Sequence, residues 1–397
     1  MEEPLKLAIL TTHPIQYFVP VFRLLGQKKD LQLKVFFGCK QGLDTLIDPD
    51  FGVVYQWDCE LTDGYAHEFI GSGSLATLKK LSSVPLTQKA LTLINQFQPD
   101  VVLIFAYLPI FITISTLLLR LKGYKLMLRA DTTDGAWSRS IVKDKLREVL
   151  LKLYYKQFSF FFPISSDSVT HYQRMGVNDN LMQMIPYAID VDFFQQQVDH
   201  WFPRRVELRK EMGIKPGDRV LIYCGKMYET KNPLLIPKAL NLLSDELKQN
   251  LWLLAVGDGT LRNQFETLSK AELGERVIFV GFKNQSQLGK YYAMGDILIL
   301  PSHWETWGLV VNEALQFGLT VITSDKVGCN PHLIPSKDQG YWFRSGSAIA
   351  LAEAVTQLCN QDRGDNHTPN FPLPHPSDLA EAIYLQAKQQ KSLNELT

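Results

Sequence analysis

Short apolar segments alternate with helical patterns along this chain, and the alternation occurs twice. Each apolar run predicts a buried strand, and each pattern after it predicts a helix. The runs lie at 5–12, 31–38, 101–107, 124–131 and 158–165 in the first half. In the second half they lie at 219–224, between 251 and Gly257, at 277–280, before Pro301 and within 320–334. Strand–helix repeats fold as parallel sheets covered by helices. We therefore expect an α/β protein with two Rossmann-like domains, although no G-x-G-x-x-G fingerprint is present.

A polar stretch with prolines separates the two repeats. With 397 residues, the chain is comfortably long for two domains. We expect an N-terminal domain at 1–195, a linker at 196–217, a second domain at 218–376 and a terminal helix at 377–397.

Composition excludes some classes of protein. The 41 Lys and Arg residues are balanced by 41 Asp and Glu residues, so there is no excess of cations for a nucleic-acid partner. Five widely spaced cysteines without a C-x-x-C pair indicate a reducing compartment and argue against a standard zinc framework. The N-terminal sequence enters a strand pattern directly and has no secretory signal, so we expect a cytoplasmic protein.

The segment 101–119 is uncharged and about long enough to cross a bilayer. The alternative is a buried strand followed by a helix that starts at Pro109, because proline suits a first helical position and a covered parallel strand is apolar throughout. The repeats on both sides favour strand and helix.

Residues 138–157 predict an amphipathic helix rich in Lys and Arg. Its cations are Arg139, Lys143, Lys145, Arg147, Lys152 and Lys156, and its recurring apolar residues are Ile141, Val142, Leu146, Val149, Leu150 and Leu153. Two interpretations stay open. The charged face is solvated, or the helix makes peripheral contact with anionic lipid at the inner face of a membrane.

The stretch 298–324 carries the most specific pattern. An apolar strand ends at Pro301, Glu305 follows in a loop, and a helix that starts near Gly308 carries Glu313. A helix N-terminus binds anions, and flanking carboxylates bind hydroxyl groups. A diphosphate between two sugars offers both an anion and hydroxyl groups.

This stretch resembles the P-S-x-x-E-x-x-G-x-x-x-x-E-A signature of family 4 glycosyltransferases, which are retaining enzymes of the GT-B fold. Thr306 and Trp307 stand where the family usually has Gly-Phe, and Lys226 replaces an arginine of the G-R-x-x-x-x-K element. The resemblance implies two facing Rossmann-like domains with a C-terminal helix that crosses back to the first. It also implies transfer of a hexose from a UDP- or GDP-sugar to a glycan or lipid-linked acceptor, in the synthesis of cell-surface polysaccharide or glycolipid.

The resemblance further implies roles for individual residues. Glu305 would bind the donor hexose, Lys226 and Lys231 the diphosphate, and Glu313 the ribose. The donor-binding set is Gly225, Lys226, Lys231, Gly257, Phe282, Glu305, Thr306, Trp307, Gly308, Leu309 and Glu313.

The first domain offers His13, at the end of the first strand, as a catalytic candidate beside Glu305, Lys231 and Lys226. The usual first-domain histidine is absent between Pro99 and Gly135. The D-x-D triplet 190–192 lies in the interdomain segment, where we predict turn contacts rather than a metal site. We expect no metal and no cofactor besides the donor. A non-catalytic GT-B nucleotide-binding module and a GT-B sugar-nucleotide epimerase remain as alternatives.

Overall fold

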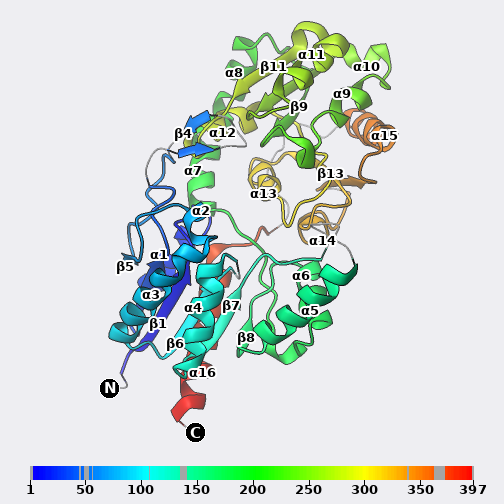
Figure 1. The fold of residues 1–397 in the computed structure, drawn as a ribbon. Helices are drawn as coiled ribbons and strands as arrows, with labels where there is room; N and C mark the ends of the chain where they lie inside the picture. Colours follow the sequence, from blue (N-terminus) through cyan, green and yellow to red (C-terminus); the bar gives the residue numbers. More distant parts are fainter. Residues whose placement is uncertain are drawn as a thin grey trace. The chain divides into compact units, whose positions relative to one another are not determined.

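The computed structural model describes residues 3–43, 46–48, 53–55, 57–106, 108–134, 141–337, 339–361 and 372–395. The chain forms two compact units (Figure 1). The first comprises 1–46, 59–187 and 374–397, and the second comprises 47–58 and 188–373.

The first unit is built on a six-stranded parallel sheet with the order β5-β2-β1-β6-β7-β8. Its strands are β1 (Leu5–Thr11), β2 (Leu31–Phe37), β5 (His67–Phe69), β6 (Val101–Phe105), β7 (Lys125–Arg129) and β8 (Phe160–Phe161). Its helices are α1 (Val19–Gly26), α2 (Leu75–Leu78), α3 (Val84–Phe97), α4 (Ile110–Leu121), α5 (Ile141–Tyr155), α6 (Ser166–Arg174) and α16 (Pro376–Glu395), with short turns η1 (Leu81–Ser83) and η2 (Asp179–Leu181). A separate pair of strands consists of β3 (Leu46–Asp48) and β4 (Val53–Tyr55).

The central strands of this sheet are apolar because both faces are covered. All five residues of β6 are buried, and α4 follows it directly after Pro109. The strand-and-helix interpretation of 101–119 is therefore confirmed. Among the described residues, no helix has both the length and the apolar character needed to cross a membrane.

The C-terminal helix returns to the first unit, as the fold class predicted. α16 packs on α1. Lys28 Nζ in the turn after α1 forms an ion pair with Glu381 Oε2 at 2.6 Å, and Tyr384 donates a hydrogen bond to Asp30. Contacts between residues more than 350 positions apart thus attach the end of the chain to its first repeat.

The second unit repeats the architecture with a six-stranded parallel sheet of order β11-β10-β9-β12-β13-β14. Its strands are β9 (Arg219–Cys224), β10 (Leu251–Val256), β11 (Val277–Gly281), β12 (Ile297–Leu300), β13 (Thr320–Ser324) and β14 (Gly340–Phe343). Its helices are α7 (Val191–Trp201), α8 (Arg205–Glu211), α9 (Leu235–Leu240), α10 (Asp245–Gln249), α11 (Arg262–Leu273), α12 (Gln285–Met294), α13 (Leu309–Gln316), α14 (Asn330–Leu333) and α15 (Ala348–Cys359), with turns η3 (Phe202–Arg204), η4 (Glu229–Lys231) and η5 (Gly274–Arg276).

The stretch 196–217, expected as a linker, is largely helical and belongs to the second unit. Asp190 caps α7 by accepting a hydrogen bond from Phe193 N at 3.1 Å, so the D-x-D triplet begins a helix. Leu208 in this stretch and Phe194 just before it are buried, so the polar stretch has an apolar side to pack.

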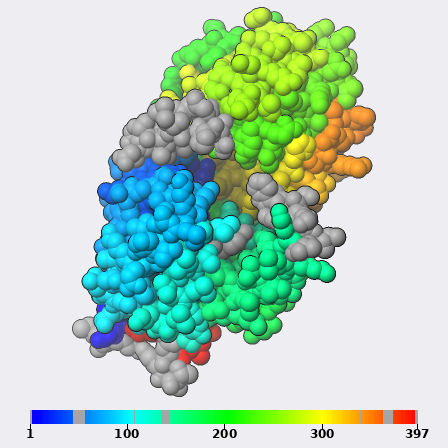
Figure 2. Space-filling model, viewed as in Figure 1, coloured from blue at the N-terminus to red at the C-terminus, as the bar shows by residue number. Residues whose placement is uncertain are grey.

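The predicted helix at 138–157 is α5, and its first three positions lie outside the described residues. In the space-filling view, the teal-green segment that contains α5 and α6 lies on the surface of the first unit (Figure 2).

Candidate active site

The loops after β9, β10 and β11 are joined by backbone hydrogen bonds at the carboxyl edge of the second sheet. Gly225 N donates to Val256 O at 2.9 Å, and Gly257 N donates to Gly281 O at 2.9 Å. Gly257 has φ 131°, and a Cβ there would lie 1.9 Å from Gly225 O. Only glycine allows this approach. The predicted donor-binding residues Gly225 and Gly257 are therefore neighbours.

Glu305 and Lys231 meet at the same edge. Lys231 Nζ forms an ion pair with Glu305 Oε1, and Ser302 Oγ donates to that oxygen at 2.9 Å. His303 N donates to Thr230 O at 2.8 Å, which holds the two loops together. The side chains of Lys231 and Glu305 are 22% and 12% exposed, so the pair can still be reached from solvent. Two catalytic candidates that are 74 positions apart in sequence thus form one group.

The loop that carries Glu305 is fastened to the loop after β13. Glu305 N donates to Lys326 O at 3.0 Å, and Gly328 N donates to Glu305 O at 3.1 Å. A Cβ on Gly328 would lie 2.2 Å from Thr306 O, so glycine is needed for the two loops to pack. Glu305 and Thr306 are consequently held by backbone contacts on both sides.

Trp307 packs inward from this loop. Its side chain is buried, its Nε1 donates to Asn312 Oδ1 at 2.8 Å, and its ring stacks on His332 with centroids 5.6 Å apart. The replacement of the family's smaller Gly-Phe pair thus adds packing beneath the loop. Any ligand contact of Trp307 would come from its backbone.

Gly308 and Leu309 place a helix N-terminus beside Glu305. Gly308, with φ 104°, is the N-cap of α13, and Leu309 is its first residue. The first amides of a helix lack intrahelical acceptors and carry its positive dipole end. Both residues are half-buried. The site therefore combines a carboxylate, an ammonium group and an anion-binding helix end.

Glu313 lies one turn into α13 and is only 1% exposed. Tyr292 Oη donates to Glu313 Oε2 at 2.8 Å, and Tyr292 is equally buried. Burial, with the nearby Cys224 and Glu313 adding to it, raises the pKa of Tyr292 well above its ordinary value, so its hydroxyl stays a donor. Burial also raises the pKa of Cys224 to about 12. Glu313 is thus held in one orientation.

Lys226 and Phe282 follow β9 and β11 and are half-buried. Tyr223 Oη donates to Lys226 O at 2.6 Å, which anchors the backbone of that loop. Both residues therefore lie at the edge that carries Glu305. Their contacts with a donor remain predictions.

Three contributing residues were missed by the sequence analysis: Ser302, Tyr292 and Trp304. Ser302 belongs to the family signature, which was the available signal for it. Nothing in the helical pattern distinguished Tyr292. The Trp304 Nε1 atom is buried and has no hydrogen-bond partner in the described part of the chain, which makes its N–H a free donor beside Glu305.

His13 lies in the first unit, after β1. Thr12 Oγ1 is 2.8 Å from His13 Nδ1. Burial lowers the pKa of His13 from 6.5 to about 4, so the imidazole is neutral at physiological pH. A neutral imidazole with this pKa is a weak base, so His13 is better suited to positioning a ligand than to abstracting a proton.

Arg129 ends β7 and is fully buried. Its Nη1 donates to Phe162 O at 3.1 Å and to Ile185 O at 2.5 Å. Burial lowers its pKa to about 10, so it stays charged. Arg129 therefore holds the end of the first unit together.

Among the described residues, no group of three or more His, Cys, Asp and Glu side chains could hold a metal ion. The expectation of a metal-independent site remains a prediction.

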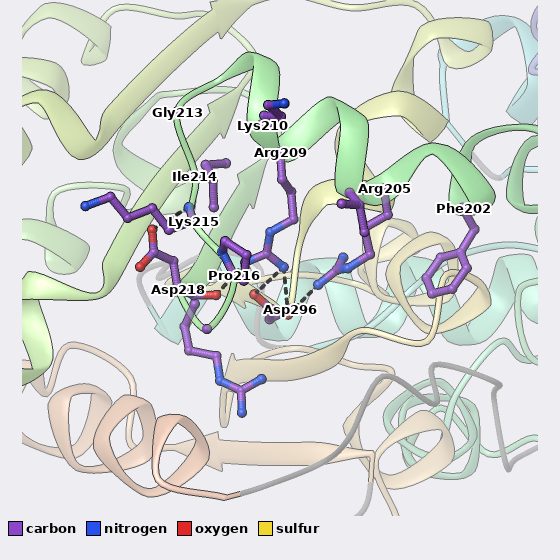
Figure 3. Close-up of a pocket in the computed structure, with 13 residues that line it drawn as sticks. Phe202, Arg205, Arg209, Lys210, Gly213, Ile214, Lys215, Pro216, Asp218 and Asp296 are labelled. Atoms are coloured by element: carbon purple, nitrogen blue, oxygen red, sulfur yellow. Dashed lines mark hydrogen bonds and ion pairs between the residues drawn. The ribbon is translucent and has the colours of Figure 1, made fainter.

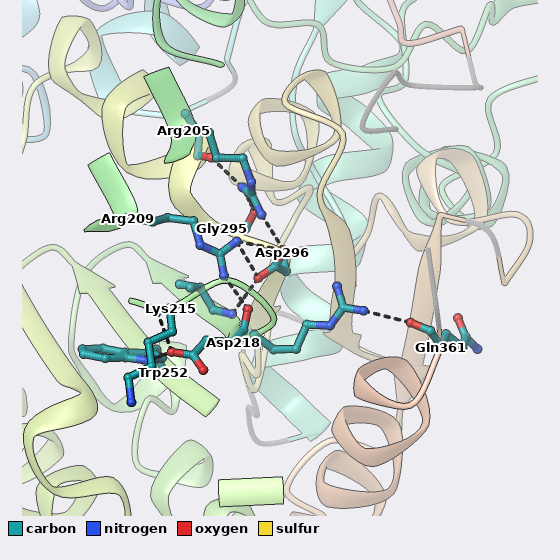
Figure 4. Close-up of polar contacts among 11 residues, drawn as sticks. Arg205, Arg209, Lys215, Asp218, Trp252, Gly295, Asp296 and Gln361 are labelled. Carbon is teal, nitrogen blue, oxygen red and sulfur yellow. Dashed lines mark hydrogen bonds and ion pairs between the residues drawn. The ribbon is translucent and has the colours of Figure 1, made fainter. Parts of the chain in front are cut away.

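A cavity of about 900 Å³ lies at the opposite edge of the second sheet, where β9 and β12 begin (Figure 3). Its arginines are already engaged by the protein. Arg205 donates to Asp296 Oδ1 at 2.5 Å, and Arg209 donates to the carbonyl of Asp218 (Figure 4). Asp218 also accepts from Trp252 Nε1 at 2.8 Å. This network joins α8 to the sheet and is separate from the site around Glu305.

Residues 204–370 match the family described as glycosyl transferases group 1. These residues belong to that family. The group 1 domain lies within the second unit and contains Lys231, Glu305 and Glu313.

Curated relatives match the chain in part. The N-acetyl-alpha-D-glucosaminyl L-malate synthase of Bacillus anthracis is 27% identical over 50% of this chain and 51% of its own length. An uncharacterized glycosyltransferase of Methanocaldococcus jannaschii is 28% identical over 44% of this chain and 42% of its own. The chain thus spans about half the length of these curated relatives.

Solved structures match over nearly the whole chain. The sucrose-phosphate synthase of Thermosynechococcus elongatus has a TM-score of 0.69 at 16% identity and covers 98% of this chain and 100% of its own. The Anabaena protein HepE in complex with UDP and glucose has a TM-score of 0.65 at 16% identity, with 98% of both chains covered. The group 1 domain is therefore part of a GT-B fold.

Proposed function

We propose that this protein is a retaining glycosyltransferase that moves a hexose from a UDP- or GDP-sugar to a hydroxyl group of a glycan or lipid-linked acceptor. The observation that carries the proposal is the Lys231–Glu305 pair beside the N-terminus of α13 in a group 1 domain. This arrangement offers groups for both the diphosphate and the sugar of such a donor.

The leaving diphosphate is stabilised by Lys226, Lys231 and the first amides of α13. Such fixed cations and dipoles act most strongly where charge develops in the transition state. Glu305 accepts hydrogen bonds from hydroxyls of the donor hexose, and Glu313 accepts from the ribose. The free N–H of Trp304 is a further donor at the site.

In the proposed reaction the bond between the anomeric carbon and the phosphate oxygen breaks, while the acceptor oxygen bonds to the same face of that carbon. The acceptor proton goes to the departing phosphate oxygen. No strong protein base is required, which agrees with the low pKa of His13. The protein contributes positioning and electrostatic stabilisation.

The names of relatives support the substrate classes. HepE was solved with UDP and glucose, and an Escherichia coli relative is named for transfer of galactose from UDP-Gal to a diphosphoundecaprenol-linked sugar. That relative is 26% identical over 47% of this chain and 47% of its own length. We accordingly propose a cytoplasmic role at the inner face of a membrane, in synthesis of cell-surface polysaccharide or glycolipid, with UDP-sugars as the first donors to test.

The test is nucleotide release from a panel of UDP- and GDP-sugars, with and without glycan and lipid-linked acceptors, in the presence of EDTA. We expect acceptor-dependent release, retained anomeric configuration by NMR, and a drop of roughly 10²–10³-fold in Glu305→Gln and Lys231→Ala. Lys238→Ala, an exposed lysine on α9, is the matched control and should act as wild type.

Unchanged turnover in both site variants would overturn the site assignment. Nucleotide binding without release would indicate the non-catalytic module, and interconversion of the sugar without transfer would indicate the epimerase. Loss of release in EDTA, restored by a divalent cation, would contradict metal independence.

A further inference from the structure

Helix α5 carries an exposed aliphatic stripe. Leu146, Val149, Leu150 and Leu153 are 62%, 55%, 57% and 55% exposed. Their spacing of i, i+3, i+4 and i+7 places all four on one side of the helix. Isolated exposed leucines are common on protein surfaces, but an aligned set on one helix is not. In Figure 2 the segment that contains α5 lies at the surface.

The opposite side of α5 is fixed in the core of the first unit. Leu151, Tyr154 and Tyr155 are buried there, and Tyr154 Oη donates to Thr116 Oγ1 on α4 at 3.1 Å. Tyr155 Oη lies 3.0 Å from His171 Nε2 on α6. Because aromatic packing holds the inner side, the helix cannot rotate to hide its stripe.

Cations border the stripe on both sides. From helical spacing, Lys143 and Arg147 lie along one border, and Lys145 and Lys152 lie along the other. Lys156 follows directly after the helix and is exposed. The two carboxylates of this segment, Asp144 and Glu148, lie by helical spacing on the side away from the stripe; Asp144 is exposed and Glu148 is half-buried. Glu148 is engaged there by Lys152 at 2.6 Å and by Arg174 at 3.0 Å.

We infer that α5 is a docking surface for an anionic lipid bilayer. The inference rests on the proposed role at the inner face of a membrane and deepens it, because it names the surface that makes the contact. No group of the candidate active site belongs to this surface. The helix would lie in the plane of the interface, with its aliphatic stripe at the acyl boundary and its lysines extended to phosphate headgroups. The positive borders match the negative surface of such a membrane.

A second protein fits the stripe less well. Four half-exposed aliphatic side chains offer much less area than the ~800 Å² that each partner contributes to a standard interface. Flexible lysines on both borders also suit a planar, uniformly charged surface better than a shaped protein surface.

The experiment is co-sedimentation of the full chain with vesicles of phosphatidylglycerol and phosphatidylcholine, and with vesicles of phosphatidylcholine alone, without donor sugar. We expect binding to the anionic vesicles that weakens with salt. Leu146→Gln with Leu150→Gln should lower partitioning at least about tenfold. Ile349→Gln, which changes an equally exposed aliphatic residue on α15, is the control and should bind as wild type.

A second variant tests the charges. Lys143→Gln, Lys145→Gln and Lys156→Gln together should lower binding to anionic vesicles roughly 100-fold. The control replaces the exposed Lys210, Lys215 and Lys238 of the second unit by glutamine. Circular dichroism should show all variants folded, since every changed side chain is exposed.

The inference would be overturned if the wild-type protein did not bind anionic vesicles, or if the Leu146→Gln, Leu150→Gln variant bound them as well as wild type. A dimer in sedimentation velocity that the double leucine variant dissociates would show a subunit interface instead. Vesicle binding is measured without turnover, so it fails or succeeds independently of the transferase proposal.

Discussion

The hydrogen bond from Tyr292 to Glu313 allows a sharp test of how the second carboxylate is held. Tyr292→Phe removes one oxygen and leaves a carboxylate oxygen, in a residue 1% exposed, without its donor at 2.8 Å. A hydrogen bond to a charged group contributes roughly 1.5–3 kcal/mol. For a unit of this size that corresponds to a fall in Tm of roughly 3–12 °C.

The same change should weaken nucleotide binding. If Glu313 binds the ribose, loss of its orienting partner is expected to raise the Kd for UDP or GDP about tenfold, which is about 1.4 kcal/mol. Thermal unfolding and isothermal titration calorimetry measure the two effects separately. Tyr341→Phe is the matched control, because its half-exposed hydroxyl accepts from Gln357 and Gln361; it should change stability by less than about 0.5 kcal/mol.

Thermal unfolding and nucleotide affinity test two separate parts of the reasoning. A Tyr292→Phe protein as stable as wild type would refute the reasoning about the buried bond. A destabilised protein with unchanged nucleotide affinity would show that the buried hydrogen bond stabilises the fold but that Glu313 does not bind the ribose.

Three other predictions concern a close glycine contact, the titration of His13 and the burial of the cysteines. Gly257→Ala should cost at least about 3 kcal/mol in denaturant unfolding because its Cβ would meet Gly225 O. Gly217→Ala, whose Cβ would have open space, should cost about 1 kcal/mol; equal costs would contradict the close loop approach. His13 should titrate near pH 4 by NMR. Because its folded pKa lies below its unfolded value, its contribution to stability should be complete above pH 6.5 and be lost as the pH falls toward 4. A titration midpoint near pH 6.5 would show an exposed imidazole. With a thiol reagent the native protein should show at most one fast cysteine, Cys59, since burial raises the pKa of the other four; several fast thiols would contradict this burial.

Much of the candidate site was predictable because its residues follow strands. The carboxyl ends of parallel strands meet at one edge, so Lys231 after β9 and Glu305 after β12 had to come close once the strand order placed β9 beside β12. Their direct pairing was not predictable, because it depends on side-chain rotamers and on Ser302.

Other features escaped sequence reasoning for similar reasons. Tyr292 reaches Glu313 across 21 positions from a different helix, and no local pattern marks such a contact. Within the polar stretch 196–217, α8 is attached to the amino edge of the sheet by the pairing of Arg205 with Asp296, two residues 91 positions apart.

The sequence by itself determined the two α/β repeats, the edge at which the site lies and the cationic, apolar helix predicted at 138–157, because hydrophobic periodicity is a local property. Only the tertiary structure decided which side of that helix faces the core. Tyr154 and Tyr155 fill the interior beside α4 and α6, so Leu146 and Leu150 are left outside. That choice depends on the shapes of packed neighbours, which the sequence of one helix does not contain.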